Sequence, residues 1–571
     1  MRAHLEAPAS NPPARLSEVF SGRLADYAGA ATLGCAVIAT RIPLAGRYLF
    51  DWDSLQFALG MQRFNLATHR PHPPGYVGYI FLGRLLAGIF GGDANLGLVA
   101  LSILAEALSV VAIFVVARHL LGQFAGLAAA VLLLTSPLYW LYGETALTYG
   151  LEPGLSLIGF WLVYRAVQAG GKGLVPASLM IGLSGAIRPS AEFFLLPLLC
   201  AGIALTLWNA RQPGPLRLRQ ARDLVMLPVA AVVAGTCVWL VPLLILSGGP
   251  AAYLYFSGRL AARVSGNSAV WRAGLGGLAL NSQAVLTGLA LSLGVYLALA
   301  ASTPALALVP GLRAGGGRLP RSFVVLGVAW ILPAGATFLL VHIGQVAYVL
   351  FLLPALLLPA GLVLDRVARL VTGPWPGWRG RTRWALLLAC AGTNIATFAL
   401  PSGSLLSQVQ ARDRHVEALV SLVRRYPPAQ TVLLADPEGP NSYRTAMFYL
   451  PEYQVIALGR DERGRAGELF SNRPGAPEYD LTRFEQAGTL ELPAMGTALI
   501  MDEALLATIG DPERLRAVTM NDPLAKQALV VELDPRDPPI ASRSWIYLRG
   551  SDYHPFRRLG RACIPVGRLG C

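Results

Sequence analysis

Two carboxylates follow the first long apolar segment of this chain directly. Asp51 and Asp53 stand in the sequence Phe50-Asp-Trp-Asp-Ser54, just after an apolar run of membrane-spanning length. A carboxylate at a membrane surface is costly unless it has a function. Such a group could act as a general base that takes the proton of a hydroxyl group. Capping of a helix that begins after the apolar segment is the structural alternative.

The spacing of Asp51 and Asp53 also matches the D-x-D motif with which soluble glycosyltransferases hold a metal ion and a nucleotide diphosphate. Nucleotide sugars are cytoplasmic, whereas the topology argued below places this loop on the outer side. The location therefore favours a general base, and metal dependence stays open: no cofactor is indicated with certainty, and a divalent metal ion is the one candidate.

Two histidines follow in a stiff turn. His69 and His72 flank Pro71, and Pro73-Pro74-Gly75 comes next. Proline at a helix start and glycine in a tight turn give the chain a rigid entry into the following helix. The two histidines could bind phosphate oxygens or a carboxylate. Ordinary polar residues at the membrane interface are the alternative.

Three later loops carry further candidates. Glu144 follows the third apolar span and is expected to converge with Asp53 as a pair of carboxylates. Arg188 could hold a phosphate group by forked hydrogen bonds, or could only extend its charge to the interface. His342 and Gln345 offer polar atoms in a short turn between two spans, although this turn could be a plain helical hairpin.

Two other acids have structural explanations. Glu106 lies inside the second span, where an acid is a functional suspect by default. Its distance from the outer loops favours packing or pairing inside the helical bundle. Glu152 precedes Pro153 at a helix start, where an acid suits the helix dipole. Capping is therefore the expected role of Glu152.

The composition indicates a membrane protein. The chain has 571 residues and is 54% hydrophobic, and its mean hydropathy is +0.51. Apolar runs of about 17–25 residues recur, the length that crosses a bilayer as a helix. We expect eleven spans near residues 27–45, 97–117, 120–138, 150–168, 174–188, 190–208, 223–246, 276–300, 322–341, 346–364 and 384–401.

Residues 75–90 are apolar but short, and Arg84 interrupts them. If this segment lies flat on the outer surface, the most basic loops and the N-terminal tail all face the cytoplasm. The basic residues of those loops are Arg118, Arg165, Lys172, Arg211, Arg217, Arg219, Arg222, Arg313, Arg318, Arg321, Arg366, Arg369, Arg379, Arg381 and Arg383. The candidate site residues then share the outer face.

The net charge of +14 could indicate a nucleic-acid partner. However, residues 402–571 are nearly balanced in charge, and the basic excess lies in the first 401 residues. This distribution is typical of cytoplasmic membrane loops. We therefore expect membrane lipids and no nucleic acid as partners, and a location in the bacterial inner membrane or the plasma membrane.

Charge rises and long apolar runs stop after residue 401. The pattern predicts helices over 412–426 and 443–450 and strands over 431–436, 453–458 and 544–548. We expect a cytoplasmic tail over 1–26, a membrane domain over 27–401 and a small extracytoplasmic α/β domain over 402–571. Cys563 and Cys571 could pair on the outer side, or stay free thiols.

The residues Trp52-Asp53-Ser54 and His72-Pro-Pro-Gly-Tyr76 resemble the first outer loop of the protein O-mannosyltransferase-like membrane glycosyltransferases of the GT-C superfamily. The Glu144 loop and the turn at His342 are similar to family features. The resemblance implies a polytopic helical fold, surface helices in the first outer loop, a polyprenyl-phosphate-linked sugar as donor and transfer with inversion. It also implies that Asp53 is the catalytic base.

Ser54 stands where protein mannosyltransferases carry a glutamate, so neither a protein acceptor nor mannose is implied. The expected function is transfer of a sugar to an acceptor hydroxyl of a glycan, lipid or protein on the outer face, with Arg188, His72 or His342 at the leaving phosphate. The alternative is a transporter or flippase of lipid-linked glycans. A transporter would need polar sites at mid-membrane, whereas the polar residues here gather at one surface.

Overall fold

The computed structural model describes residues 16–211, 218–266, 268–306, 320–373, 375–400, 404–435, 442–460, 466–472, 496–501, 515–519, 529–533 and 543–547. The predicted alternatives for Cys563 and Cys571 concern residues outside these ranges.

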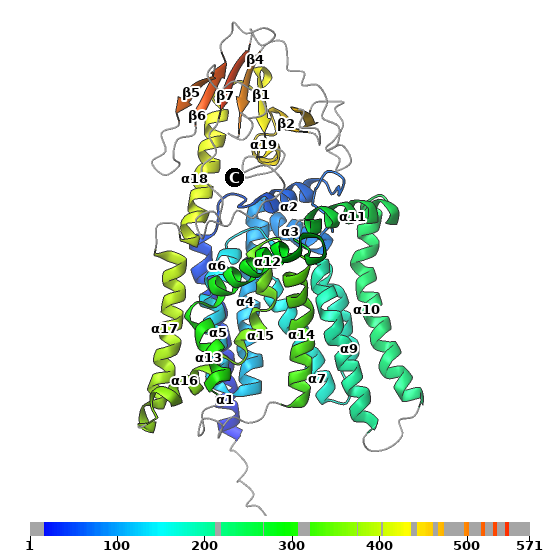
Figure 1. The fold of residues 1–571 in the computed structure, drawn as a ribbon, viewed down its shortest axis with the longest axis vertical. Helices are drawn as coiled ribbons and strands as arrows, with labels where there is room; N and C mark the ends of the chain where they lie inside the picture. The colour runs from blue at the N-terminus through cyan, green and yellow to red at the C-terminus, as the bar shows by residue number, and fades with distance from the viewer. Residues whose placement is uncertain are drawn as a thin grey trace, which may run out of the picture.

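Helices build the larger part of the molecule (Figure 1). The helices of this bundle are α1 (Leu16–Arg41), α4 (Ala94–Leu121), α5 (Gln123–Thr135), α6 (Pro137–Gly143), α7 (Glu152–Gln168), α8 (Leu174–Ser184), α9 (Pro189–Arg211), α10 (Leu218–Leu246), α12 (Val270–Leu293), α13 (Val295–Leu306), α14 (Arg321–Leu340), α15 (Leu353–Leu357), α16 (Ala360–Val371) and α17 (Arg379–Ala399). Within the described ranges, six helices are long and apolar enough to cross a membrane, or seven if the bent pair α5–α6 is one span. The chain is therefore a multi-pass membrane protein, and the count of eleven spans stays a prediction.

Two of the expected spans are wrong as single helices. The span expected over 276–300 is interrupted because α12 ends at Leu293 and Gly294 adopts a φ of 51°. The span expected over 346–364 is divided into the 3₁₀ helix η3 (Val346–Phe351), α15 and α16. Pro354 and Pro359 occupy the starts of α15 and α16. Because proline has no backbone N–H, it suits a helix start and interrupts a helix that would otherwise continue.

Three helices lie at the upper end of the bundle in Figure 1, the end that carries residues 42–52, 136–151, 185–188 and 341–345. They are α2 (Trp52–Gln62), α3 (Val77–Ile89) and α11 (Pro250–Gly266).

The contacts of α3 show how it runs. At its start, the Gly78 N–H donates to the carbonyl of Ala186, at 2.8 Å. Near its end, Ala87 packs against Gly97 at the start of α4. Ala186 lies in the turn between α8 and α9, and Gly97 lies in the first turn of α4, both at the upper end, so α3 runs along this end of the bundle. This agrees with the surface position expected for residues 75–90.

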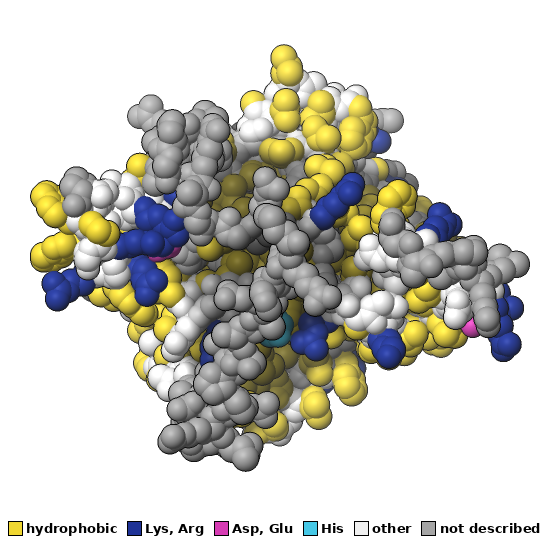
Figure 2. Space-filling model, turned by 90° about the horizontal axis from the view of Figure 1, so that it is seen from below, with side chains coloured by type: hydrophobic (Ala, Val, Ile, Leu, Met, Phe, Trp, Pro, Cys, Tyr) yellow, Lys and Arg dark blue, Asp and Glu magenta, His cyan; other side chains and the backbone are white. Residues whose placement is uncertain are grey.

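The opposite, lower end carries the first residues of α1, the end of α9 and the start of α10 (Figure 1). Lys and Arg side chains are spread over this face, whereas Asp and Glu side chains are few (Figure 2). The lower end therefore carries many basic and few acidic side chains on its visible surface, as the expected topology requires of a cytoplasmic face. That the lower end faces the cytoplasm stays a prediction.

The C-terminal part begins with α18 (Leu405–Val423), which stands on the upper end of the bundle (Figure 1). A five-stranded sheet follows in the order β3-β2-β1-β4-β7, in which β1 pairs in parallel with β2 and β4, and β4 with β7. The strands and the helix beside them are β1 (Thr431–Ala435), α19 (Tyr443–Tyr449), β2 (Gln454–Arg460), β3 (Ala466–Ser471), β4 (Gly496–Ile500) and β7 (Arg543–Tyr547); β5 (Leu515–Thr519) and β6 (Leu529–Leu533) form a separate pair.

The predicted strands 431–436, 453–458 and 544–548 correspond to β1, β2 and β7, and the predicted helix 443–450 corresponds to α19. These local predictions are confirmed. The helix predicted over 412–426 begins earlier, as α18, because the Ser404 side chain accepts the N–H of Ser407 and caps it there, at 3.2 Å. The extracytoplasmic location of this part stays a prediction.

Candidate active site

Asp51 begins α2 and caps it. Its Oδ1 accepts the N–H of Trp52 at 2.6 Å, and the Ser54 side chain accepts the N–H of Asp51 in return. The other carboxylate oxygen accepts a hydrogen bond from Gln345 Nε2 at 3.2 Å. Asp51 therefore satisfies the exposed donors of a helix start and ties the 342–348 turn to α2. The capping alternative holds for this residue.

Asp53 lies in the first turn of α2, and its side chain is 21% exposed. His72 Nδ1 lies 3.6 Å from Asp53 Oδ1, which is beyond an ordinary hydrogen bond. Asp53 therefore keeps part of its carboxylate accessible, whereas Asp51 directs both oxygens to protein donors. Of the two acids, Asp53 is the better placed to meet a substrate.

Burial raises the pKa of both carboxyl groups to about 6, and the charge of Asp53 adds to the rise at Asp51. The guanidinium groups of Arg188 and Arg444 act in the opposite direction on Asp53, because positive charges favour the ionised form. A carboxyl group with a pKa near 6 is mostly ionised at neutral pH and still accepts a proton readily. These are the properties of a general base.

Arg188 lies between α8 and α9 and is held on several sides. It forms a buried ion pair with Glu152, at the start of α7, with an N···O distance of 2.5 Å. Its Nη1 donates to Thr148 Oγ1 at 3.3 Å, and its Nε donates to Ser190 Oγ at 3.2 Å. The expected capping role of Glu152 is thus replaced by a pairing role. The start of α7 packs beside the loop of Arg188, and a buried arginine needs a counter-charge.

Two tyrosine rings lie against the Arg188 guanidinium. The Arg188 Cζ atom is 4.6 Å from the centre of the Tyr149 ring and 4.5 Å from that of Tyr348. Cation–π contacts of this kind hold a guanidinium plane in one orientation. The charge of Arg188 also influences Asp53 and Tyr76. The charges of Arg188 and Asp53 both act on Tyr149 and Tyr348. The positive group, the carboxylate and their neighbours therefore form one group of interacting residues, which we call the Asp53 cluster (Asp51, Asp53, His72, Tyr76, Tyr149, Glu152, Arg188, Gln345 and Tyr348).

His72 belongs to this cluster as a neutral ring. Its Nε2 lies 3.1 Å from the Tyr76 hydroxyl. Burial, followed by the charges of Arg188 and Arg444, lowers the pKa of His72 to about 3. His72 can therefore donate one hydrogen bond to a phosphate oxygen but adds no positive charge at neutral pH. Among the described residues around Asp53, the positive charge comes from arginine.

His69 lies in a tight turn that precedes His72. The N–H of Asn65 donates to the Arg70 carbonyl at 2.6 Å, and the N–H of Arg70 donates to the Asn65 carbonyl at 2.8 Å. His69 is buried inside this turn with a φ of 55°, a left-handed conformation that favours glycine or asparagine. The backbone contacts thus assign His69 a place in the loop structure, and its role toward a substrate stays a prediction.

The 342–348 turn contributes Gln345 to the Asp53 cluster. Through His342, the same turn also contacts the connection between α11 and α12. Tyr142 Oη donates to Gln345 Oε1 at 3.4 Å, while Gln345 reaches Asp51 through its amide nitrogen. His342 Nδ1 lies 2.9 Å from Ser268 Oγ, between α11 and α12, and burial lowers the pKa of His342. The turn is thus more than a plain hairpin, because both of its predicted polar residues have partners on other elements.

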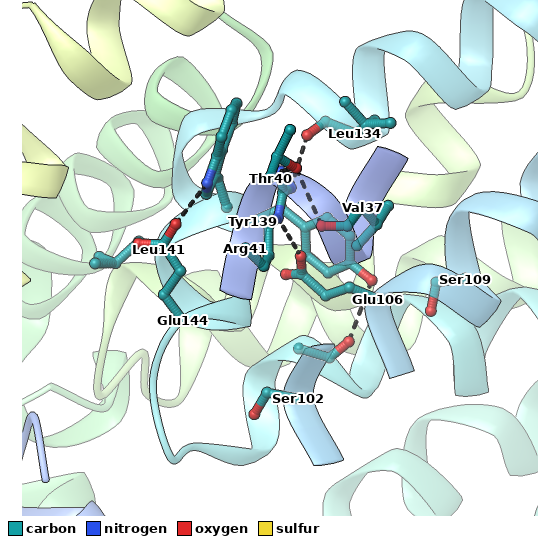
Figure 3. A network of polar contacts seen from close by, with 12 residues as sticks. Val37, Thr40, Arg41, Ser102, Glu106, Ser109, Leu134, Tyr139, Leu141 and Glu144 are labelled. Carbon is teal, nitrogen blue, oxygen red and sulfur yellow. Dashed lines mark hydrogen bonds and ion pairs between the residues drawn. The ribbon is translucent and has the colours of Figure 1, made fainter. Parts of the chain in front are cut away.

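Glu144 does not join Asp53 as expected. Its Oε1 accepts a hydrogen bond from Trp140 Nε1 at 2.6 Å, and its backbone carbonyl accepts the N–H of Gly46 at 3.0 Å. Figure 3 shows the Glu144 side chain beside Arg41 and Glu106. The physical reason is the 62° bend between α5 and α6. This bend starts at Pro137 and brings the Glu144 loop over the end of α1.

The group formed by Arg41, Glu106 and Glu144 is named the Arg41 cluster. Arg41 Nε donates to Glu106 Oε2 at 3.1 Å, and both side chains are fully buried. Arg41 Nη2 also donates to the Leu134 carbonyl at 2.7 Å (Figure 3). The expectation that Glu106 pairs inside the bundle is confirmed.

Sequence reasoning missed Glu152 as a partner of Arg188, and it missed Tyr149, Tyr142 and Arg444. The tyrosines carried a weak signal, because they flank Glu144 and Glu152 in the same loop. Arg444 carried none, since it lies in the C-terminal part. Within the described ranges, no group of three or more His, Cys, Asp or Glu side chains is arranged to hold a metal ion.

Residues 71–241 match the family model for dolichyl-phosphate-mannose-protein mannosyltransferases. This match confirms the resemblance to the protein O-mannosyltransferase-like membrane glycosyltransferases. The matched segment contains His72, Tyr76, Glu144, Glu152 and Arg188 and begins after the two aspartates. No curated protein matches the sequence.

Among solved structures, ArnT from Cupriavidus metallidurans bound to undecaprenyl phosphate is similar, with 16% identity and a TM-score of 0.44. The match covers 76% of this chain and 75% of ArnT. The archaeal oligosaccharyltransferase AglB from Archaeoglobus fulgidus, in complex with an inhibitory peptide and a dolichol-phosphate, is 13% identical with a TM-score of 0.42. That match covers 76% of this chain and 64% of AglB.

Proposed function

We propose that this chain transfers a sugar from a polyprenyl-phosphate donor to an acceptor hydroxyl at the outer face of the membrane, with inversion at the sugar carbon. The observation that carries the proposal is the partly exposed carboxylate of Asp53, which interacts electrostatically with the fixed guanidinium of Arg188 at one end of a membrane bundle. The match to a mannosyltransferase family supports it.

In this mechanism Asp53 takes the proton of the acceptor hydroxyl. The acceptor oxygen attacks the anomeric carbon of the sugar as the bond from that carbon to the phosphate oxygen breaks, and the lipid phosphate leaves with the electron pair. Arg188 holds the negative charge that develops on this phosphate, and the Tyr149 and Tyr348 rings keep its guanidinium in place. His72 and His342 contribute neutral hydrogen-bonding groups.

Asp51 and Gln345 position the base. The hydrogen bond from Gln345 to Asp51 fixes the start of α2, on which Asp53 stands. The backbone carbonyl of Glu144 holds Gly46 in the loop before α2, so Glu144 has a structural role in this proposal. His69 contributes through the turn that leads to His72.

The decisive experiment uses purified full-length protein in liposomes, radiolabelled polyprenyl-phosphate hexoses and pentoses, and an envelope extract as the source of acceptors. We expect label to move to the acceptor fraction while free lipid phosphate appears in equal amount. Mass spectrometry of envelope glycans in a deletion strain then identifies the acceptor. If intact labelled lipid crosses the liposome membrane with the sugar–phosphate bond unbroken, the chain is a flippase and the proposal is wrong.

The topology that goes with this function has residues 1–26 in the cytoplasm and residues 402–571 outside. In a variant without native cysteines, Glu452→Cys tests the C-terminal part, since Glu452 is exposed. Labelling by an impermeant maleimide should occur from outside intact cells. A reporter fused after Asp93 should report the same side as one fused after Arg47. Labelling of Glu452→Cys from the cytoplasm alone would invert the arrangement.

A further inference from the structure

Side chains of the C-terminal part form hydrogen bonds with the loop that leads into α2. The Asp413 carboxylate, on α18, accepts the backbone N–H groups of Arg47 and Tyr48, each at 3.0 Å. The N–H of Leu49 donates to the hydroxyl of Tyr449, on α19, at 2.7 Å. Three successive backbone donors just before Asp51 therefore bond to side chains that come from beyond residue 404.

Two buried arginines extend this contact toward the site. Arg412 Nε, on α18, donates to the Leu49 carbonyl at 3.2 Å. The Arg444 guanidinium, on α19, lies over the Trp52 ring with its Cζ atom 4.6 Å from the ring centre, and 4.7 Å from the centre of the Tyr443 ring. Arg444 is only 1% exposed. Since Trp52 stands between the two aspartates, Arg444 is held against the first turn of α2.

The charges around Asp53 come from several elements. Asp51 lies at the start of the same helix, and Arg188, paired with Glu152, comes from the turn between α8 and α9. Arg444 approaches from α19. The His72 ring lies next to Asp53. The charge of Asp53 also acts on four tyrosine hydroxyls, those of Tyr76, Tyr142, Tyr149 and Tyr348.

Arg188 and Arg444 act on the same two groups. Both favour the ionised form of Asp53, and both disfavour a charged His72. Arg188 comes from the membrane bundle, whereas Arg444 comes from the C-terminal part. The electrostatic setting of the candidate base is therefore shared between two parts of the chain that are distant in sequence.

We propose that Arg444 is a positioning residue for Asp53, and that the α18–α19 segment completes the catalytic site by holding the start of α2 and supplying this second positive charge. This inference rests on the proposed function for its catalytic meaning. The inference also predicts that Arg444 affects the protonation of Asp53, and this effect can be measured without any substrate.

The first test measures the protonation of Asp53 directly. A water-soluble carbodiimide with glycinamide modifies protonated carboxyl groups, and peptide mass spectrometry separates Asp53 from Asp51. In the full-length protein, Arg444→Gln should move the labelling midpoint of Asp53 to higher pH, by up to about 1 unit, because an opposing charge is lost. Arg444→Lys should restore much of the difference. Arg425→Gln, at an exposed arginine of the same C-terminal part, should leave the midpoint unchanged.

The second test uses sugar transfer. The acid limb of the pH–rate profile should move to higher pH in Arg444→Gln. In Arg444→Lys it should return toward the pH at which it lies in the unchanged protein. A purely structural role would lower the amount of folded protein and leave the position of the limb unchanged. If folded Arg444→Gln shows the original labelling midpoint and the original acid limb, the inference is wrong.

If Arg444→Gln does not fold, a third variant tests the same inference. Trp52→Leu keeps the charge of Arg444 and removes the ring on which it lies. The midpoint of Asp53 should again rise, because the guanidinium is no longer held at α2, and an unchanged midpoint would contradict the inference. If no sugar is transferred by any preparation and the midpoint still depends on Arg444, the proposed function fails while the link between Arg444 and Asp53 stands.

Discussion

The Asp53 cluster and the Arg41 cluster contain the same kinds of side chain and differ in how they are enclosed. In the Arg41 cluster, Arg41 and Glu106 are fully buried and bonded to each other. In the Asp53 cluster, Arg188 is paired with Glu152, but Asp53 remains 21% exposed. A sealed arginine–carboxylate pair can only hold helices together, whereas a partly exposed carboxylate beside a fixed arginine can meet a substrate.

The comparison also separates the two acids that the sequence suggested as a catalytic pair. Glu144 bonds to Trp140 and lies with Arg41, so it belongs to the sealed group. Asp53 lies with His72 and senses Arg188. Changes in the first group should therefore act on stability, and changes in the second group should act on rate.

The largest effect is expected at Asp53. Asp53→Asn keeps the size of the side chain but cannot accept the proton, so sugar transfer should fall by about 10²–10⁴-fold. Initial rates of lipid-phosphate release, divided by the amount of folded protein, measure this effect. Asp51→Asn should lower the rate less, because Asp51 acts through the start of α2. If Asp53→Asn is fully active and Asp51→Asn is inactive, the two roles are exchanged.

Arg41 should show the opposite behaviour. Arg41→Gln leaves Glu106 buried without its partner, and breaking a buried ion pair of this kind costs about 3–5 kcal/mol. We expect a lower unfolding temperature in detergent and an unchanged rate per folded molecule. Arg47→Gln is the matched control, since Arg47 pairs with Glu417 at the surface and little stability should be lost. A large loss of rate with intact stability would move the Arg41 cluster into the catalytic machinery.

A substitution at Arg188 tests whether binding of the donor phosphate needs the planar guanidinium or only a positive charge. Arg188→Lys keeps the charge but loses the planar fork and the contacts with Tyr149 and Tyr348. The rate at limiting donor should fall by up to about 10²-fold, the size of effect that misplacing a catalytic group produces. Arg211→Lys, at the end of α9 on the opposite side of the bundle, is the control. Equal effects of the two substitutions would remove Arg188 from the donor site.

The smallest effect concerns pH. Because the pKa of Asp53 is raised to about 6, the rate should fall as the pH drops through about 6. Stability should change in the opposite direction. The folded protein binds this proton more readily than the unfolded chain, whose pKa is near 3.8, so the contribution of Asp53 to stability rises as the pH falls from about 6 toward 3.8. Parallel rate and unfolding measurements between pH 5 and pH 8 check both signs, and a rate independent of pH in this range would contradict the role of Asp53.

Local sequence patterns were sufficient for much of this protein. Long apolar runs revealed the membrane helices, and alternating or short apolar runs after residue 401 revealed β1, β2 and β7. The motif around Asp53 and His72 located the candidate site, because its residues lie close together in one loop. Interruptions were missed at Gly294 and Pro354, since an apolar run continues through them.

Side-chain partnership was decided by the tertiary structure. The sequence determined that Glu144, Glu152 and Arg188 lie near helix ends, but the bend between α5 and α6 decided that Glu144 faces Arg41, and the packing of α7 decided that Glu152 faces Arg188. In the same way, only the docking of α19 on α2 brought Arg444 to Trp52. Helix periodicity is a local property of the chain, whereas the partner of a buried charge depends on which helix ends meet in space, and these ends are far apart in the sequence.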